Sequence, residues 1–293
     1  MKTFYPFGTI ALILVNILKG VNMSIKLIAL DIDDTLLDSQ NKILPSTKKA
    51  LDKALDKGIK VVLCSGRPLA GVSPYLEELN ISGKEQYVIT YNGGLVETAS
   101  GDILSRKIID NQGFKKIVGF ATEKKMPYYF LDDQSNVYTA DKNINRFTIV
   151  QAWENKAGIF VRTPQDFPDD FEITKVAVVG EKDQLDQYEQ PVKDQFGNDY
   201  YVVRAGDNFI EIMNPTANKG TGLETLVKIL GFKKDEIMAF GDEQNDLPMF
   251  DYVGHAIAMG NGSDVAKERA DYVTDSNDND GIAKALDKLV FND

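Results

Sequence analysis

The chain has 293 residues, of which 43% are hydrophobic and 26% charged, an ordinary globular composition with room for one large or two modest domains. Its net charge of −11 argues against a general binder of nucleic acids or anionic membranes, because such partners require a basic surface. The single cysteine, Cys64, excludes a disulfide within the chain, and the single histidine, His255, excludes a multi-histidine metal site. We interpret both residues as structural. Because the chain as a whole is acidic, any site that binds phosphate must be a local one.

Residues 1–23 differ from the rest of the chain. Residues 4–21 are largely apolar, but the central run at 10–18 is short for a membrane span, and no small-residue cleavage site follows it. Met23 and Ser24 directly precede the first predicted strand, so we expect translation to start at Met23 and residues 1–23 to be an apolar extension that is not part of the fold. A secretion signal or an anchor is the alternative. We expect a cytoplasmic protein with no stable membrane association.

The first predicted strand ends in a group of carboxylates. The run at 25–30 is apolar apart from Lys26 and predicts a buried parallel strand, which Asp31, Asp33 and Asp34 follow. Carboxylates at such an edge repel one another and lose hydration, so a cation or a shared proton is needed. Mg²⁺ suits this place because hard cations bind carboxylate and carbonyl oxygens. From this stretch alone, a solvated acidic turn that caps a helix is the alternative.

The next elements repeat the strand and helix alternation of a parallel sheet covered on both faces. A helix opens at Pro45 and stops at Gly58, and the strand predicted at 59–64 ends in Ser65, Gly66 and Arg67. If the crossover is right-handed and the strands are neighbours, Ser65 faces the acidic cluster. A third strand is predicted at 87–90.

Residues 93–207 are less regular and richer in aromatic residues. Short strands are predicted at 127–131, 173–179 and 200–203, with a helix at 183–196 and a further strand at 209–213. The stretch is too long for a loop. We therefore predict an inserted α/β cap domain at 93–207, with residues 24–92 and 208–293 forming the catalytic core.

The alternating pattern then resumes. Lys219 lies at the start of a predicted helix, where a cation is unfavourable against the helix dipole unless an anion is also present. The strand at 237–240 is followed by Gly241 and Asp242, and further strands are predicted at 255–259 and 272–274. The fold class is therefore α/β, with a doubly wound, Rossmann-like parallel sheet and an inserted α/β cap.

Five dispersed residues fall at strand ends or at a helix start: Asp31, Asp33, Ser65, Lys219 and Asp242. Together they supply a nucleophile, an acid/base, a hydroxyl, a cation and a metal ligand. This is the equipment of phosphoryl transfer, in which a metal and a lysine neutralise the phosphate while a carboxylate attacks it.

The motifs also carry a family resemblance. Asp-x-Asp-x-Thr, Ser-Gly-Arg, Lys-Gly and Gly-Asp-x-x-Asn-Asp, in this order, resemble the four motifs of the haloacid dehalogenase superfamily. The large insert between the second and third motifs resembles its Cof-like sugar-phosphatase branch. The resemblance runs from Met23 to the C-terminus and departs at Asp34, where that branch commonly has glycine.

The resemblance implies a role for each matching residue. Asp31 would be the nucleophile, and Asp33 the general acid and then the general base. Mg²⁺ would be held by Asp31, Asp242 and the backbone carbonyl of Asp33. Ser65, Lys219 and Asn245 would bind the phosphate. Asp246 would support the metal site. Arg67 would either contact the substrate or form a salt bridge that steadies the turn of the second motif.

The expected function is that of a Mg²⁺-dependent phosphatase acting on small phosphorylated metabolites, foremost sugar phosphates, through an aspartyl-phosphate. A phosphosugar mutase or phosphotransferase on the same fold is the main alternative. A regulatory phosphoacceptor is disfavoured because such domains are shorter and lack a cap. A non-catalytic phosphosugar sensor would be expected to have lost Asp31 or Asp33, and both are present.

Overall fold

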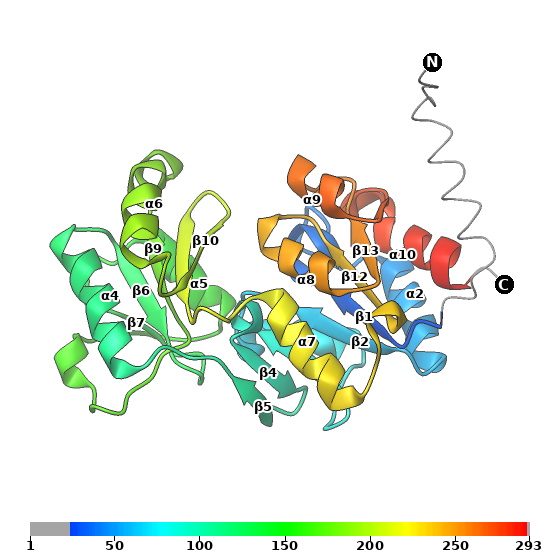
Figure 1. Ribbon diagram of the computed structural model, residues 1–293, viewed down its shortest axis with the longest axis horizontal. Helices are drawn as coiled ribbons and strands as arrows, with labels where there is room; N and C mark the ends of the chain where they lie inside the picture. The colour runs from blue at the N-terminus through cyan, green and yellow to red at the C-terminus, as the bar shows by residue number, and fades with distance from the viewer. Residues whose placement is uncertain (1–23, 292–293) are drawn as a thin grey trace, which may run out of the picture.

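The computed structural model describes residues 24–291, and Figure 1 shows two lobes side by side. The predicted extension at residues 1–23 lies outside the described residues. Each lobe is built on a sheet of its own. Among the described residues, no helix is both long enough and apolar enough to cross a membrane.

The larger sheet has the predicted doubly wound topology. Within residues 24–291 its eight strands follow the order β14 (Tyr272–Val273), β13 (His255–Ala258), β12 (Ile237–Gly241), β1 (Leu27–Leu30), β2 (Lys60–Cys64), β3 (Tyr87–Thr90), β4 (Leu95–Thr98) and β5 (Ile103–Arg106). The strands from β14 to β3 are parallel, whereas β4 and β5 are antiparallel additions at one edge. The chain order reverses between β1 and β12, which is where open α/β sheets bind their ligands.

Helices cover both faces of this sheet. Ile28 and Leu30 of β1 belong to the core on one face, and Leu27 and Ala29 to the core on the other. The first face packs against α2 (Pro45–Asp56), α3 (Leu69–Glu78) and α10 (Gly281–Leu286), and the second against α7 (Lys219–Leu230), α8 (Leu247–Tyr252) and α9 (Asp264–Arg269). Burial on both sides explains why the strands are nearly continuous apolar runs.

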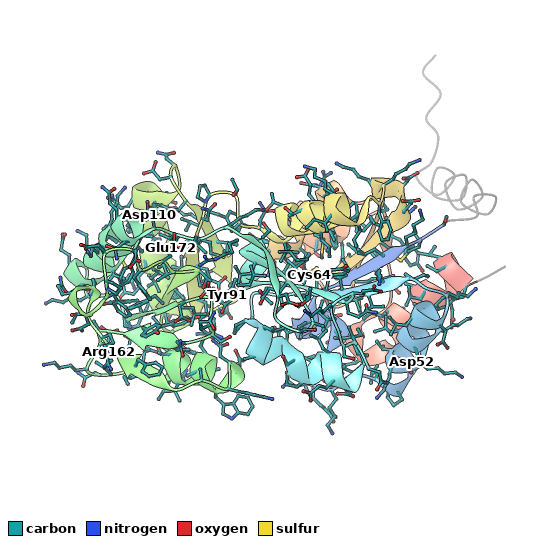
Figure 2. All side chains as sticks on the ribbon, turned by 90° about the horizontal axis from the view of Figure 1, so that it is seen from below. Asp52, Cys64, Tyr91, Asp110, Arg162 and Glu172 are labelled. Atoms are coloured by element: carbon teal, nitrogen blue, oxygen red, sulfur yellow. The ribbon has the colours of Figure 1, made fainter. Side chains whose placement is uncertain are left out.

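The smaller sheet forms the second lobe. Within the described part of the chain it has six strands, in the order β10 (Tyr201–Ala205), β11 (Phe209–Met213), β9 (Lys175–Val179), β6 (Tyr128–Leu131), β7 (Val137–Thr139) and β8 (Ile159–Val161). One face packs against α4 (Asn111–Glu123) and α6 (Lys182–Phe196), and the other against α5 (Arg146–Glu154). Tyr91 of the larger lobe joins this second core, and Figure 2 shows it between the lobes.

The division between the sheets differs from the predicted insert at 93–207. β4 and β5 fall inside those limits but pair with the larger sheet, and β11 falls outside them but pairs with β9 and β10. Short connections explain both differences, because each hairpin keeps its two strands in one sheet. The chain passes between the lobes after β5 and again after β11, where Asn214 Nδ2 donates a 2.8 Å hydrogen bond to the carbonyl of Ile108.

Candidate active site

Strand register brings the predicted site residues to one edge of the larger sheet. Leu30 of β1 is level with Leu63 of β2 and with Phe240 of β12. The polar residues that follow these strands therefore arrive side by side. They line a cavity of 380 Å³ that also has walls from the smaller lobe. The predicted site residues in its lining are Asp31, Asp33, Ser65, Arg67, Asp242 and Asn245.

Lys219 is buried outside the cavity lining and forms ion pairs with two carboxylates, those of Asp31 and Asp246. Its Nζ atom lies 2.5 Å from Oδ1 of Asp31 and 2.6 Å from Oδ1 of Asp246. Asn218 caps α7 by accepting the N–H of Thr221, which fixes Lys219 as the first residue of the helix. Burial lowers the pKa of Lys219, but Asp246 and Asp31 more than offset this and raise it overall. The predicted conflict between this cation and the helix dipole is therefore resolved by two carboxylates within the protein.

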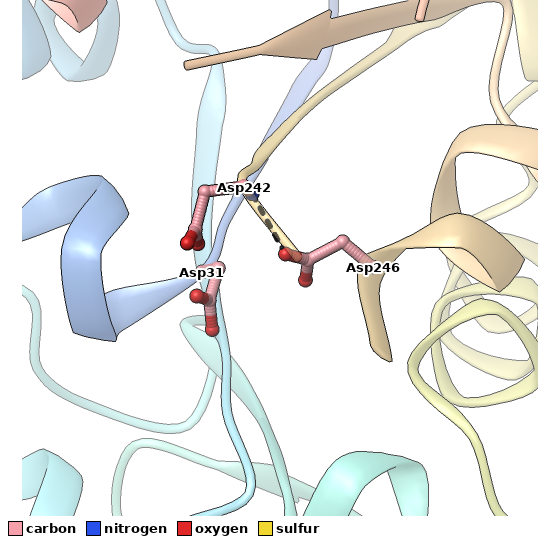
Figure 3. Close-up of side chains that lie close together, drawn as sticks. All are labelled: Asp31, Asp242 and Asp246. Carbon is pink, nitrogen blue, oxygen red and sulfur yellow. Dashed lines mark hydrogen bonds between the residues drawn. The ribbon is translucent and has the colours of Figure 1, made fainter. Parts of the chain in front are cut away.

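Asp246 holds the loop that follows β12. Its Oδ2 atom accepts the backbone N–H groups of Asp242 and Glu243 at 2.9 and 3.1 Å, and Figure 3 shows the first of these hydrogen bonds. Gly241 allows this approach, because a Cβ atom there would lie 2.4 Å from the carboxyl carbon of Asp246. Both oxygens of Asp246 thus accept hydrogen bonds from the protein.

Three carboxylates form a compact acidic group. Asp31, Asp242 and Asp246 each offer one oxygen, and these atoms lie within 4.8 Å of one another. Burial raises the pKa of Asp31 well above its usual value, and burial, followed by the charge of Asp246, raises the pKa of Asp242 to about 7. Thr35 donates a 2.9 Å hydrogen bond to Asp242. Because Lys219 supplies a single positive charge to three carboxylates, the oxygen donors fit an additional hard cation.

Arg67 forms a two-point ion pair with Asp33. Its Nη2 and Nε atoms donate to the two carboxylate oxygens at 2.7 and 3.1 Å. The same guanidinium lies 3.9 Å from Glu154 of α5, so it also faces the smaller lobe. The sequence left two interpretations of Arg67, a salt bridge and a substrate contact. The salt bridge is present, and its partner is the predicted general acid Asp33. Arg67 also lines the cavity, where it can reach a substrate.

In the part of the chain that the structure describes, Ser65, Asn245 and His255 each form a single hydrogen-bonding contact of their side chain. The hydroxyl oxygen of Ser65 accepts the backbone N–H of Arg67 at 3.1 Å. Asn245 Nδ2 lies 3.4 Å from the side-chain oxygen of Asn92, which follows β3. His255 lies outside the cavity lining, with its Nε2 atom 3.1 Å from the carbonyl oxygen of Asp235.

Sequence reasoning missed the residues that the smaller lobe contributes to the cavity. They include Gln151, Glu154, Lys175, Phe209 and Glu211. A signal was present, because Lys175 and Glu211 are charged residues within the apolar runs that predicted β9 and β11. Buried charges in strands are rare without a partner or a function.

Comparisons with known proteins identify the family of this chain. The family described as haloacid dehalogenase-like hydrolase matches residues 28–286. YxeH of Bacillus subtilis is 34% identical over 267 residues, which are 91% of this chain and 98% of that protein. The 5-amino-6-(5-phospho-D-ribitylamino)uracil phosphatase YwtE of the same organism is 30% identical over 90% of this chain and 98% of its own. The crystal structure of a haloacid dehalogenase-like hydrolase from Bacteroides thetaiotaomicron has a TM-score of 0.80 at 28% identity, and the match covers 90% of this chain and 99% of that one.

Proposed function

The chain belongs to the haloacid dehalogenase-like hydrolases, and we propose that it is a Mg²⁺-dependent phosphatase that forms a phosphorylated Asp31 during turnover. The phosphatase class follows from the family and its relatives. The observation that carries the mechanism is the buried contact of Lys219 with Asp31, beside Asp242 at the edge of the sheet. It combines a carboxylate nucleophile with the positive charge that phosphoryl transfer requires.

In the proposed reaction, an oxygen of Asp31 attacks phosphorus, and the bond to the leaving oxygen breaks. Asp33 donates a proton to that oxygen, so that an alcohol leaves. Water then attacks the phosphorus of the phosphorylated Asp31 and gives a proton to Asp33. The bond between phosphorus and the Asp31 oxygen breaks, so that inorganic phosphate leaves and the Asp31 carboxylate is restored. Both oxygens of Asp33 accept hydrogen bonds from Arg67, so the proposed proton transfer at Asp33 takes place beside this guanidinium. A substrate phosphate offers Arg67 another acceptor.

The other residues hold the phosphate and the metal in this proposal. Ser65, Lys219 and Asn245 bind phosphate oxygens, and Asp246 orients Lys219 and the loop of Asp242. The carboxylates of Asp31 and Asp242 and the backbone carbonyl of Asp33 would hold Mg²⁺. When bound, the ion offsets negative charge on the phosphate and the carboxylates.

We propose small, hydroxylated phosphate esters such as sugar or polyol phosphates as substrates, in a cytoplasmic setting. The smaller lobe forms part of the cavity wall, and it contributes polar side chains that can bind hydroxyl groups, including Gln151 and Glu154. The name of the relative YwtE refers to a phosphorylated ribityl compound, which is a polyol phosphate. The confined cavity and the acidic chain disfavour nucleic acids and phosphoproteins.

A phosphate-release screen tests this proposal. Purified protein is incubated with sugar phosphates, polyol phosphates, nucleotides and phosphoproteins, with and without Mg²⁺. We expect release of inorganic phosphate from the small hydroxylated esters only with Mg²⁺. Transfer of phosphate to another sugar without release would favour the mutase or phosphotransferase alternative. Release that is independent of a divalent cation would contradict the metal assignment.

A further inference from the structure

A buried ion pair between Lys175 and Glu211 forms part of the cavity wall contributed by the smaller lobe. Lys175 opens β9 and Glu211 lies in the neighbouring strand β11, where it is level with Ala177. The two residues are only 1% and 4% exposed. The strands therefore bring two opposite charges together diagonally on the sheet face that is turned toward the larger lobe.

Both members of the pair also contact the larger lobe. Lys175 Nζ lies 3.3 Å from the carbonyl oxygen of Gly66, the residue after Ser65. Asn92 Nδ2 donates a 2.7 Å hydrogen bond to Oε2 of Glu211, whose Oε1 atom accepts from Lys175. Both oxygens of Glu211 are thereby used. Lys175 has three N–H donors, and within residues 24–291 two acceptors contact them, so one donor remains for a ligand.

Stability alone does not explain this pair. Replacing a buried ion pair by apolar residues of similar volume is often neutral or stabilising, because desolvation of both charges offsets their attraction. The remaining positions of β9 and β11 are all apolar. A charge pair at the wall of the cavity, in contact with the loop of Ser65, therefore has a better explanation in ligand binding.

We propose that Lys175 binds an oxygen of the leaving group next to the substrate phosphate, and that Glu211, held by Asn92, positions the Lys175 ammonium. This inference rests on the proposed phosphatase function and adds a residue that determines specificity. A leaving group with hydroxyls near the phosphate offers Lys175 an acceptor, whereas an alkyl group does not. Lys175 thus favours hydroxylated esters, and Glu211 acts through Lys175.

The test compares two primary alkyl phosphates of equal carbon number, glucitol phosphate and hexyl phosphate, with the full-length protein. The double variant Lys175→Met/Glu211→Gln removes both charges and leaves no lone buried charge. We expect its preference for glucitol phosphate over hexyl phosphate, measured as a ratio of kcat/KM, to fall about 10-fold to 100-fold, the range for a hydrogen bond to a charged group. The loss of kcat/KM is expected to be larger for glucitol phosphate than for hexyl phosphate, and to appear in KM for glucitol phosphate.

Two further variants make the result decisive. Lys115→Met/Asp169→Asn removes an exposed ion pair of the same lobe, whose two residues lie outside the cavity lining, and is expected to leave the ratio unchanged. Lys175→Arg keeps the positive charge but moves its donors, so it is expected to fold and to lower the glucitol preference even if the double variant unfolds. Unchanged ratios in both Lys175 variants, or equal losses on both substrates, would overturn the inference and leave the phosphatase function intact. A wild-type protein that releases no phosphate from either ester would contradict both.

Discussion

The Nζ atom of Lys219 lies 2.5 Å from the Oδ1 atom of Asp31, although 188 positions separate these residues in the sequence. The same ammonium lies 2.6 Å from Asp246, whose other oxygen holds the loop after β12. One buried cation at the start of α7 therefore connects the ends of the two strands between which the sheet order reverses. Lys219 therefore affects both the stability of the core and the electrostatic environment of Asp31.

Replacing Lys219 by Met is expected to destabilise the protein strongly. Asp31 and Asp246 would be left as buried carboxylates without their cation, and removing one partner of a buried pair lowers the free energy of unfolding by about 3–5 kcal/mol. Urea denaturation measures this change. Lys228→Met is the matched control on the same helix, because that side chain is 71% exposed and surface ion pairs such as the one with Glu224 contribute little to stability. Equal losses in the two variants would contradict the account.

Replacing Asp31 by Asn is expected to abolish turnover while the fold survives. The change nearly conserves volume, and Lys219 keeps Asp246 as a partner. Phosphate release with Mg²⁺ should fall by roughly 1000-fold or more, as is typical when a nucleophile is removed. Asp56→Asn on α2, which is exposed and distant from the cavity lining, serves as the control. Near-normal turnover in Asp31→Asn would exclude it as the nucleophile.

Replacing Asp33 by Asn is expected to affect substrates unequally. An alkyl phosphate needs protonation of its leaving oxygen, whereas an activated aryl phosphate departs with little help. The rate of phosphorylation of the enzyme, measured by rapid quench, should therefore fall far more with hexyl phosphate than with an aryl phosphate. Folding should be retained because the Asp33 side chain is 53% exposed. Equal losses with the two esters would argue against Asp33 as the general acid.

The raised pKa of Asp242 leads us to expect that the stability of the protein depends on pH. Burial and Asp246 raise its pKa to about 7 in the folded protein, above its usual value of 3.8. Between these two values the folded state binds the proton more tightly than the unfolded state, so this group's contribution makes stability without metal fall as the pH rises from 3.8 to about 7. Asp242→Asn should remove that part of the slope. Thermal unfolding across this pH range measures it, and identical slopes in the two proteins would contradict the assignment.

Magnesium binding should show the opposite dependence in the same protein. A proton on Asp242 competes with the ion, so the Mg²⁺-induced rise in Tm should grow as the pH increases toward and past about 7. Asp242→Asn should lose most of this rise at every pH. A rise in Tm that is equally large in wild type and variant would place the ion elsewhere.

The core fold and its site could be predicted because each signal is local in the sequence. Apolar runs ending in polar residues identify the strands, and a parallel sheet brings those ends together. The strands predicted at 87–90 and 209–213 coincide with β3 and β11. The helix predicted at 183–196 matches α6 (Lys182–Phe196) to within one residue.

Long-range pairing was less accessible to sequence reasoning. The β4–β5 hairpin has the same short strand pattern as the inserted lobe, and only its hydrogen bonds to β3 assign it to the larger sheet. The pairings of Arg67 with Asp33 and of Lys175 with Glu211 depend on side-chain positions 34 and 36 residues apart. Neither separation corresponds to a local sequence period, so the part of the cavity wall that the smaller lobe contributes could not be predicted from the sequence.

Trapping the phosphorylated enzyme tests the central claim most directly. The Asp33→Asn variant is mixed with an aryl phosphate and Mg²⁺ and quenched in acid, and its peptides are analysed by mass spectrometry. Attack on phosphorus needs little help from Asp33 with this ester, whereas the hydrolysis step lacks its general base, so the phosphorylated enzyme should accumulate. The account predicts phosphate on Asp31 and its loss when Asp31→Asn is added. Phosphate on another residue, or continued release of phosphate with no phosphorylated peptide, would contradict it.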